Sequence, residues 1–301
     1  MNMQTITNSR FGVGLGLAVG KRLPTAISYP LVNFMAARMA RLENLSIVQS
    51  VRNNQQVIRE KRLAPVELHK AVTDVFVYAG RCLVDFYRGL RSPAALQQKV
   101  LKNEALERLI GLSRDKYFGA FLVVPHMSSF DLMLLAAAAL GFEAKVLTFG
   151  KPTGGYKLQN DIRAISGLEI MPVSRNVHKK SIDVMQKGGF VLTAIDRPMS
   201  GQRRQLNFFG HPSPLPAGHI RMALKANVPI IAAAVHLNKD GLYQLSLSKP
   251  IPMIRMADST EEIRWNAENI LRRIEGYIRS HPSQWQMYYP VWPDEQISLK
   301  I

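Results

Sequence analysis

Apolar residues recur with a helical period through the first third of the chain. In residues 69–90, seven of them (Val72, Val75, Phe76, Ala79, Leu83, Phe86 and Leu90) are spaced so that they fall on one stripe of a helix. The flanking segments 42–60 and 94–112 also carry spaced aliphatic residues between polar ones. We therefore expect residues 1 to about 115 to be mostly helical.

Short apolar runs alternate with amphipathic segments from Lys116 onward. The runs predict strands at 117–124, 143–148, 168–173, 190–195, 229–236 and 243–248. The segments between and after them predict helices at 128–140, 157–165, 179–187, 217–227 and 260–280. This alternation predicts an α/β fold with a mostly parallel central sheet and helices on both faces. Sites in such sheets lie beyond the carboxyl ends of the strands, where His126 and Asp196 occur.

Two apolar stretches open the chain. The first, residues 11–20, is about half as long as the roughly 20 residues that a membrane span requires. The second, residues 23–40, is interrupted by two prolines and an arginine. We interpret residues 1–41 as a helical segment that lies at the membrane interface and precedes an acyltransferase domain at 42–301. A single tilted span and a flexible glycine-rich start are the alternatives.

The charge balance is strongly basic. The chain has 39 Lys and Arg against 22 Asp and Glu, a formal net charge of +17. Such a surplus favours a polyanionic partner, which could be nucleic acid, an anionic membrane surface or a phosphorylated or acidic substrate. We find no motif that reads nucleic acid, so we expect an anionic membrane surface and no nucleic-acid partner.

The sequence offers little for metal or cofactor chemistry. A single cysteine, Cys82, precludes an intramolecular disulfide and a cysteine-based metal cluster, and its apolar surroundings predict a buried, inert thiol. The histidines have no ligand-like spacing, so we expect no metal site and no cofactor. A serine-hydrolase elbow and a phosphate-binding P-loop are also absent from the sequence.

The clearest candidate for chemistry is His126, which precedes Asp131 in the run PHMSSFD. On a continuous helix these two side chains would lie about 140° apart, but a turn before the helix can fold the imidazole back. Asp131 in the first helical turn would stay ionised, because the helix dipole favours negative charge there. The Asp131 carboxylate could then accept a hydrogen bond from one imidazole nitrogen of His126 and leave the other nitrogen as a general base. This base would take the proton of a substrate hydroxyl, and the hydroxyl oxygen would attack a thioester directly.

Further polar residues follow the later strands. Asp196 and Arg197 come directly after the run 190–195, where an ordinary turn aspartate is the alternative interpretation. Several cations also fall near this predicted edge of the sheet, namely Arg175, Lys179, Lys180, Arg203 and Arg204. Grouped there, they could hold a phosphate or a phosphopantetheine arm.

Five segments between about residues 40 and 295 occur in the order found in a known family. They are VVPHMSSFD, GKPTGGYKLQNDIRAISG, MPVSRNVHKKSIDVMQKGGFVLTAIDRP, NFFGHPSPLPAGHIRMALKANVPIIAAAV and HPSQWQMYYPVW. In these segments the chain resembles the lipid A late acyltransferases of the lauroyl and myristoyl type. It also resembles the related phosphatidylinositol mannoside acyltransferases, and both belong to the lysophospholipid acyltransferase superfamily.

The resemblance implies an O-acyltransferase with His126 as general base and Asp131 as its partner. It also implies that residues which bind the acceptor or donor head group include Asn160, Arg163, Arg175, Asp196 and Arg197. The donor would be acyl-carrier protein or acyl-CoA, used by a peripheral or monotopic protein at the cytoplasmic face of the bacterial inner membrane.

The closing segment departs from the family pattern, because YYPVWP lacks the usual basic cluster. We therefore expect the acceptor to be a hydroxyl of a membrane glycolipid or lysolipid, and do not restrict it to lipid A. The alternatives are a non-catalytic basic protein that binds lipid or nucleic acid, and a lipid hydrolase that uses water as acceptor.

Overall fold

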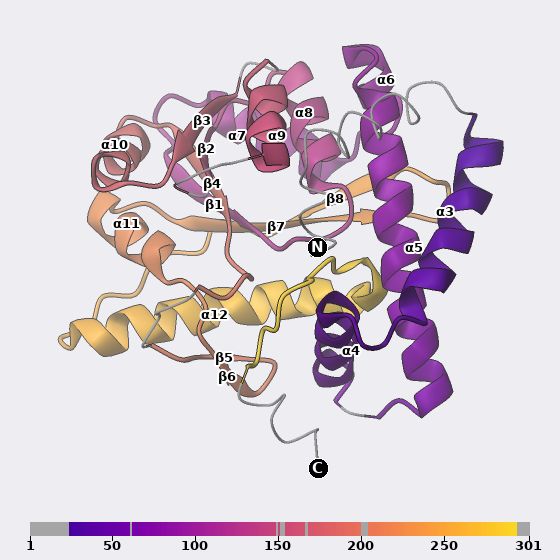
Figure 1. Ribbon diagram of the computed structural model, residues 1–301. Helices are drawn as coiled ribbons and strands as arrows, with labels where there is room; N and C mark the ends of the chain where they lie inside the picture. The colour runs from indigo at the N-terminus through magenta and orange to yellow at the C-terminus, as the bar shows by residue number, and fades with distance from the viewer. Residues whose placement is uncertain are drawn as a thin grey trace.

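A six-stranded sheet forms the centre of the described part of the protein (Figure 1). The computed structural model describes residues 24–60, 62–148, 150, 154–165, 168–199 and 204–293. From one edge of the sheet to the other, the strands are β3 (Glu169–Pro172), β2 (Lys145–Thr148), β4 (Phe190–Ala194), β1 (Ala120–Val124), β7 (Ile230–Leu237) and β8 (Tyr243–Leu247). Neighbouring strands are parallel except for β8, which pairs antiparallel with β7. The predicted mostly parallel sheet is confirmed.

Helices cover both faces of this sheet. One face carries α10 (Arg175–Gln186), α11 (Gly218–Ala226) and α12 (Ser259–Ser280). The other carries α5 (Pro65–Gly89), α6 (Pro93–Gln97), α7 (Glu104–Arg114) and α8 (Phe130–Ala139). The other helices of the described residues are α3 (Thr25–Ala40), α4 (Ser46–Ile58), α9 (Gly154–Ile165) and the short 3-10 helix η1 (Pro282–Gln284). The expected layering is therefore present.

The central strand β1 shows why its sequence is apolar throughout. Phe121 and Val123 pack into the core on the α11 and α12 side, whereas Leu122 and Val124 pack into the core on the α8 side. All five residues of the strand are buried. A strand that is covered on both faces needs apolar side chains at every position, and this produces the continuous run seen in the sequence.

One predicted helix is divided in two. Residues 94–112 were expected to form a single helix, but α6 and α7 are separated at Val100, which forms a β-bridge with Tyr243. Leu101 donates its amide to the Tyr243 carbonyl at 2.8 Å, and the Tyr243 amide donates to the Lys99 carbonyl at the same distance. The segment 99–101 thus forms backbone hydrogen bonds with the open edge of β8. The periodicity of apolar residues within 94–112 does not predict this pairing.

A short hairpin is also present that the sequence pattern did not predict. The strands β5 (Leu206–Phe208) and β6 (His211–Ser213) pair antiparallel around the Phe-Phe-Gly run. The turn requires left-handed backbone at Phe209, with φ of 53°, and at Gly210, with φ of 79°. Trp292 stacks on Phe208 and donates its indole N–H to the Phe208 carbonyl at 3.0 Å, which packs the chain's last described segment against the hairpin.

The second apolar stretch of the N-terminus forms α3, which packs along α5. Val32 of α3 approaches α5 at Gly80, where an added Cβ would clash with the valine side chain. Tyr29 donates its hydroxyl to the buried Asp85 carboxylate of α5 at 2.8 Å. Within the described residues, no helix has both the length and the apolar content needed to cross a membrane. The stretch 11–20 lies outside the described residues.

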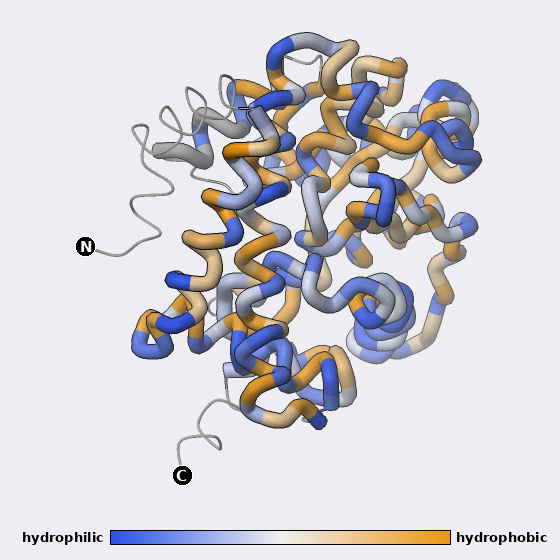
Figure 2. Tube along the Cα trace, turned by 90° about the vertical axis from the view of Figure 1, so that its right-hand side faces the viewer, coloured by the Kyte–Doolittle hydropathy of each residue, from blue (hydrophilic) through white to orange (hydrophobic). Residues whose placement is uncertain are grey.

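The outer face of α3 remains apolar. Four large side chains are exposed at helical spacing, with exposed fractions of 55% at Ile27, 46% at Leu31, 59% at Phe34 and 61% at Met35. Figure 2 views the molecule from the side that carries α3 in Figure 1, and colours apolar positions orange. A surface helix that is apolar on both faces is unusual unless a second apolar partner covers the outer one.

Candidate active site

The carboxyl ends of β1 and β4 bring His126 and Asp196 together. These strands are parallel neighbours with Val124 opposite Ala194, so the residues that follow each strand emerge side by side. The imidazole Nδ1 of His126 lies 2.6 Å from Asp196 Oδ1. The His126 backbone amide donates to Asp196 Oδ2 at 2.8 Å. One carboxylate thus contacts both the ring and the backbone of the histidine.

Trp285 completes the surroundings of this carboxylate. Its indole Nε1 donates to Asp196 Oδ2 at 2.7 Å, and Asp196 has no exposed surface. Trp285 belongs to a closing segment that runs antiparallel to residues 126–128, with Met127 and Trp285 directly opposite. The Gln286 amide donates to the His126 carbonyl, and the Ser128 amide donates to the Gln284 carbonyl, both at 2.8 Å. The last described part of the chain therefore helps to build the site.

The electrostatics keep Asp196 ionised. Burial alone would raise the pKa of Asp196, but the charge of His126, hydrogen bonds from its ring and backbone, and the Trp285 indole together hold that pKa below its ordinary value. An ionised carboxylate accepts hydrogen bonds only, so Nδ1 of His126 carries the proton. In the neutral imidazole, Nε2 is then left with a free lone pair, on a side chain that is 30% exposed.

The contact expected between His126 and Asp131 is absent, and no hydrogen bond joins these two residues in the part of the chain that the structure describes. Asp131 instead forms an ion pair with Arg163 of α9, in which Arg163 Nε lies 2.7 Å from Asp131 Oδ1. Because α8 begins at Phe130, Asp131 stands in its first turn and reaches across to α9. The carboxylate that holds the imidazole comes from β4, and this corrects the pairing inferred from sequence spacing.

Arg163 and Asn160 occupy the neighbouring wall of the site. Arg163 donates to the Asn160 amide oxygen at 2.9 Å, and the Asn160 amide nitrogen lies 3.4 Å from the Thr148 hydroxyl at the end of β2. Both predicted residues are buried, with exposed fractions of about 6%. The predicted polar residues of α9 therefore lie next to Asp131, and Arg163 lines the pocket itself.

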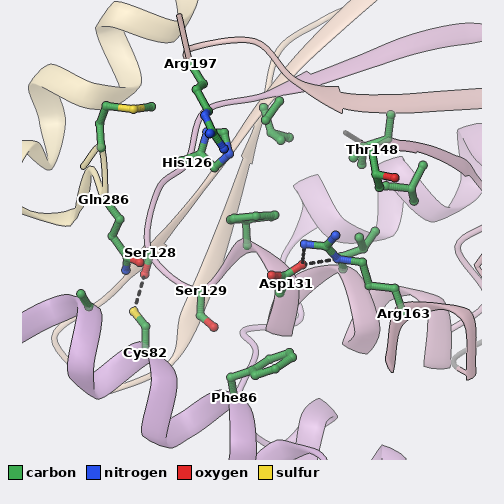
Figure 3. A pocket seen from close by; sticks show the side chains of 18 of the residues that line it. Cys82, Phe86, His126, Ser128, Ser129, Asp131, Thr148, Arg163, Arg197 and Gln286 are labelled. Carbon is green, nitrogen blue, oxygen red and sulfur yellow. Dashed lines mark hydrogen bonds and ion pairs between the residues drawn. The ribbon is translucent and has the colours of Figure 1, made fainter. Parts of the chain in front are cut away.

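A pocket of about 300 Å³ opens in front of His126 (Figure 3). Figure 3 shows Asp131 and Arg163 on one side of it and Gln286 with Ser128 on the other, with His126 and Arg197 above and Phe86 below. Much of the remaining wall is apolar and comes from α5, α8 and the strand ends: Ala79, Leu83, Val124, Leu134, Val146, Leu147, Leu192 and Ala194. The site thus joins a polar reaction centre to an apolar wall.

A second, smaller cavity continues behind this wall. It measures about 40 Å³ and is lined by apolar residues alone. Four residues line both cavities and therefore separate them: Val124, Phe130, Leu134 and Leu192. The residues that line only the smaller cavity include Met133 and Ala137 of α8, Phe142 between α8 and β2, and Ala233 of β7. A cavity of this composition excludes water and suits a hydrocarbon.

The other predicted binding residues are more scattered. Arg197 lines the pocket at its exposed rim, with its guanidinium carbon 3.7 Å from the centre of the Tyr289 ring. Asp196 lies behind His126, fully buried, and does not reach the pocket surface. Arg175 begins α10, but its side chain lies outside the described part of the structure, as does Arg203. Lys180 forms an ion pair with Glu169 on β3.

Three further residues were not identified as site residues from the sequence. Phe130 packs edge-on against the His126 ring with 5.6 Å between ring centres. Trp285 holds Asp196, and Gln286 lines the pocket. In the sequence, the closing segment 281–292 is distinguished only by its resemblance to the family. Its position beside His126 depends on contacts between distant parts of the chain. Cys82 is buried as predicted, and burial raises its pKa to about 11, so the thiol stays protonated.

The described residues contain no group of three or more histidine, cysteine, aspartate or glutamate side chains that could hold a metal ion. The model of one protein family matches the chain over residues 4–293 and is described as bacterial lipid A biosynthesis acyltransferase. A search of curated protein sequences finds no match. The family match extends over nearly the whole chain and includes every residue of the site described above.

Proposed function

Because this chain belongs to the bacterial lipid A biosynthesis acyltransferase family, we propose that it transfers a fatty acyl chain from a thioester to a hydroxyl of a membrane glycolipid or lysolipid. The donor is acyl-carrier protein or acyl-CoA. The observation that carries this proposal is the His126–Asp196 pair, with a free imidazole nitrogen at the opening of a pocket that has an apolar wall. A base of this kind suits a reaction that removes a proton from an alcohol.

The chemistry needs one base and no enzyme-bound acyl group. His126 Nε2 takes the proton from the acceptor hydroxyl as its oxygen attacks the thioester carbonyl carbon. The new C–O bond forms a tetrahedral oxyanion, which collapses as the C–S bond breaks. The imidazolium then returns its proton to the departing thiolate. Asp196 keeps the ring in the tautomer that accepts at Nε2 and stabilises the imidazolium.

The inner cavity provides a place for the acyl chain. The two cavities share an apolar wall at Phe130 and Leu134, so a chain whose carbonyl lies beside His126 can extend past these side chains. Each buried methylene contributes about 0.8 kcal/mol when it leaves water. The residues that line only this cavity, among them Ala137 and Ala233, then limit the length of chain that fits.

Two arginines suit the polar ends of the substrates. Arg197 is exposed at the rim of the pocket, where it can pair with a phosphate of the donor or of the acceptor head group. Arg163 is already paired with Asp131, and this ion pair offers a carboxylate oxygen and guanidinium protons to a sugar or glycerol hydroxyl. These features support a polar, hydroxyl-bearing acceptor.

We place the protein at the cytoplasmic face of the bacterial inner membrane, as a peripheral or monotopic protein. The exposed apolar face of α3 and the net charge of +17 support an anionic membrane surface as partner. α3 packs on α5, and α5 supplies Ala79, Leu83 and Phe86 to the pocket. A bilayer against α3 would therefore lie close to the entrance of the site.

The proposal is tested with purified protein, saturated acyl-CoA or acyl-acyl-carrier-protein donors of several chain lengths, and an extract of bacterial membrane lipids. We expect a new acylated lipid in the mass spectrum, and its loss in a folded His126→Ala variant. An exposed histidine, His178, gives the matched control His178→Ala, which should retain full activity. Transfer at the wild-type rate by His126→Ala, or no acylated product with either donor, would rule out the proposed function.

A further inference from the structure

Gln286 is the cross-strand neighbour of His126. Residues 284–286 run antiparallel to residues 126–128, and the Gln286 amide donates to the His126 carbonyl. Side chains on such strands alternate between faces. Met127 and Trp285 point into the buried core, whereas His126 and Gln286 both line the pocket. Opposite residues on one face have Cβ atoms roughly 5 Å apart, so these two side chains enter the pocket together.

The amide nitrogen of Gln286 is buried and has no hydrogen-bond partner in the described residues. The Gln286 amide faces the Cys82 thiol and lowers the pKa of that thiol as a hydrogen-bond donor, against the larger effect of burial. Sulfur is a weak acceptor, and the amide group has a second hydrogen to donate. A buried amide N–H without a partner is unfavourable by about 1–3 kcal/mol. Such a group in the wall of the pocket that holds His126 is explained when a substrate oxygen accepts a hydrogen bond from it.

We propose that Gln286 donates a hydrogen bond to the thioester carbonyl oxygen and stabilises the oxyanion that forms on it. This inference rests on the proposed function. The carbonyl carbon must lie about 3–3.5 Å from the acceptor oxygen, which is itself within hydrogen-bond reach of His126. The carbonyl oxygen is the atom that gains negative charge, so a donor aimed at it favours the transition state over the bound substrate.

Arg163, Arg197 and Ser128 are less suited to this task. Arg163 is engaged with Asp131 and Asn160 on the opposite side of the pocket. Arg197 is stacked on Tyr289 at the exposed rim. The Ser128 amide is bonded to the Gln284 carbonyl, and the Ser128 hydroxyl lies 3.6 Å from the Cys82 sulfur. Gln286 offers a neutral amide donor in the wall of the same pocket as His126, with hydrogen-bonding capacity left over within the described residues.

The test compares steady-state kinetics of Gln286→Leu, which removes the donor at similar volume, and Gln286→Glu, which keeps the shape but presents a carboxylate. With palmitoyl-CoA as donor, we expect kcat to fall about 10²–10³-fold in both variants. KM for palmitoyl-CoA should change by less than about threefold, because the interaction acts in the transition state. The exposed Gln98 gives the matched control Gln98→Leu, which should retain the wild-type kcat.

A binding measurement separates catalysis from packing. S-hexadecyl-CoA is a thioether without a carbonyl oxygen, so wild type and both Gln286 variants should bind it with equal affinity. An unchanged kcat, or a loss that appears only in KM or in thioether binding, would refute the role of Gln286. If wild type transfers acyl groups and His126→Ala does not, such a result overturns this inference alone. If His126→Ala keeps full activity, the proposed function itself fails.

Discussion

Asp196 Oδ1 lies 2.6 Å from Nδ1 of His126, although the two residues are 70 positions apart in the chain. The contact exists because β1 and β4 are parallel neighbours in register, so their carboxyl ends present successive residues to each other. The same carboxylate accepts from Trp285 and from the His126 backbone, and burial excludes water from it. These contacts hold the His126 ring in one orientation and one tautomer. The ring can therefore act as a base without first having to rotate or exchange a proton.

Removal of the Asp196 charge should impair catalysis without unfolding the site. An asparagine at this position can keep the geometry but favours the wrong imidazole tautomer, so Asp196→Asn should lower kcat about 10³–10⁴-fold. Trp285→Phe keeps an aromatic side chain but removes the indole donor, and we expect a smaller loss of about tenfold. Wild-type kcat in a folded Asp196→Asn protein would disprove the role of this pair.

The ion pair between Asp131 and Arg163 should contribute mainly to the architecture of the pocket. Its side chains are 18% and 7% exposed, so removal of one partner leaves the other charge largely buried and unpaired. Arg163→Leu should lower the free energy of unfolding by about 3–5 kcal/mol. The double variant Arg163→Leu with Asp131→Leu should recover much of this loss, as measured by urea denaturation. Equal destabilisation in the single and double variants would show that the two charges are not coupled.

Acyl-chain preference should depend on the inner cavity. Ala233 and Ala232 are adjacent on β7, but Ala233 lines the cavity, whereas Ala232 packs into the core on the other face of the sheet. Ala233→Val should shift the preferred donor to a shorter chain, because the larger side chain fills part of the cavity, and Ala232→Val should not. The measurement is kcat/KM across a series of saturated acyl-CoA donors. The same profile in both variants would mean that the chain lies elsewhere.

Membrane binding should depend on the outer face of α3. Phe34→Glu with Met35→Glu replaces two side chains that are 59% and 61% exposed by charges that do not enter a bilayer. We expect this variant to lose sedimentation with vesicles that contain anionic lipid, while its activity on detergent-dispersed acceptor persists. Val66 is 82% exposed on α5 and provides the control Val66→Glu, which should bind vesicles as wild type does. Equal binding by both variants would exclude α3 as the membrane contact.

His219 should make the protein less stable in acid. Burial lowers the pKa of His219 to about 3. As the pH falls below about 6.5, the imidazole therefore becomes charged in the unfolded chain but stays neutral in the folded protein. The unfolded state therefore binds the extra proton from about pH 6.5 downward, and stability falls by about 1.4 kcal/mol per pH unit. His219→Leu should reduce the loss between pH 7.5 and 5 by about 2 kcal/mol. The exposed His178 provides the control His178→Gln, and an unaltered slope in His219→Leu would contradict this prediction.

The sequence by itself determined the class of fold and where chemistry would occur. Apolar runs separated by amphipathic segments led to the parallel sheet, because strands buried on both faces must be apolar at every position. The predicted strand ends also placed His126 and Asp196 correctly at the same edge. The resemblance over five segments agreed with the family that matches residues 4–293.

Only the tertiary structure decided which groups meet at that edge. Sequence spacing favoured Asp131 as the partner of His126, because spacing shows which residues are close along the chain. It does not show which residues are close across a sheet. The order of the strands puts β4 beside β1, which brings Asp196 to the imidazole and leaves Asp131 to Arg163. Trp285 and Gln286 reach the site only through an antiparallel contact with residues 126–128. Such long-range pairings are set by packing of the whole core, which no local pattern encodes.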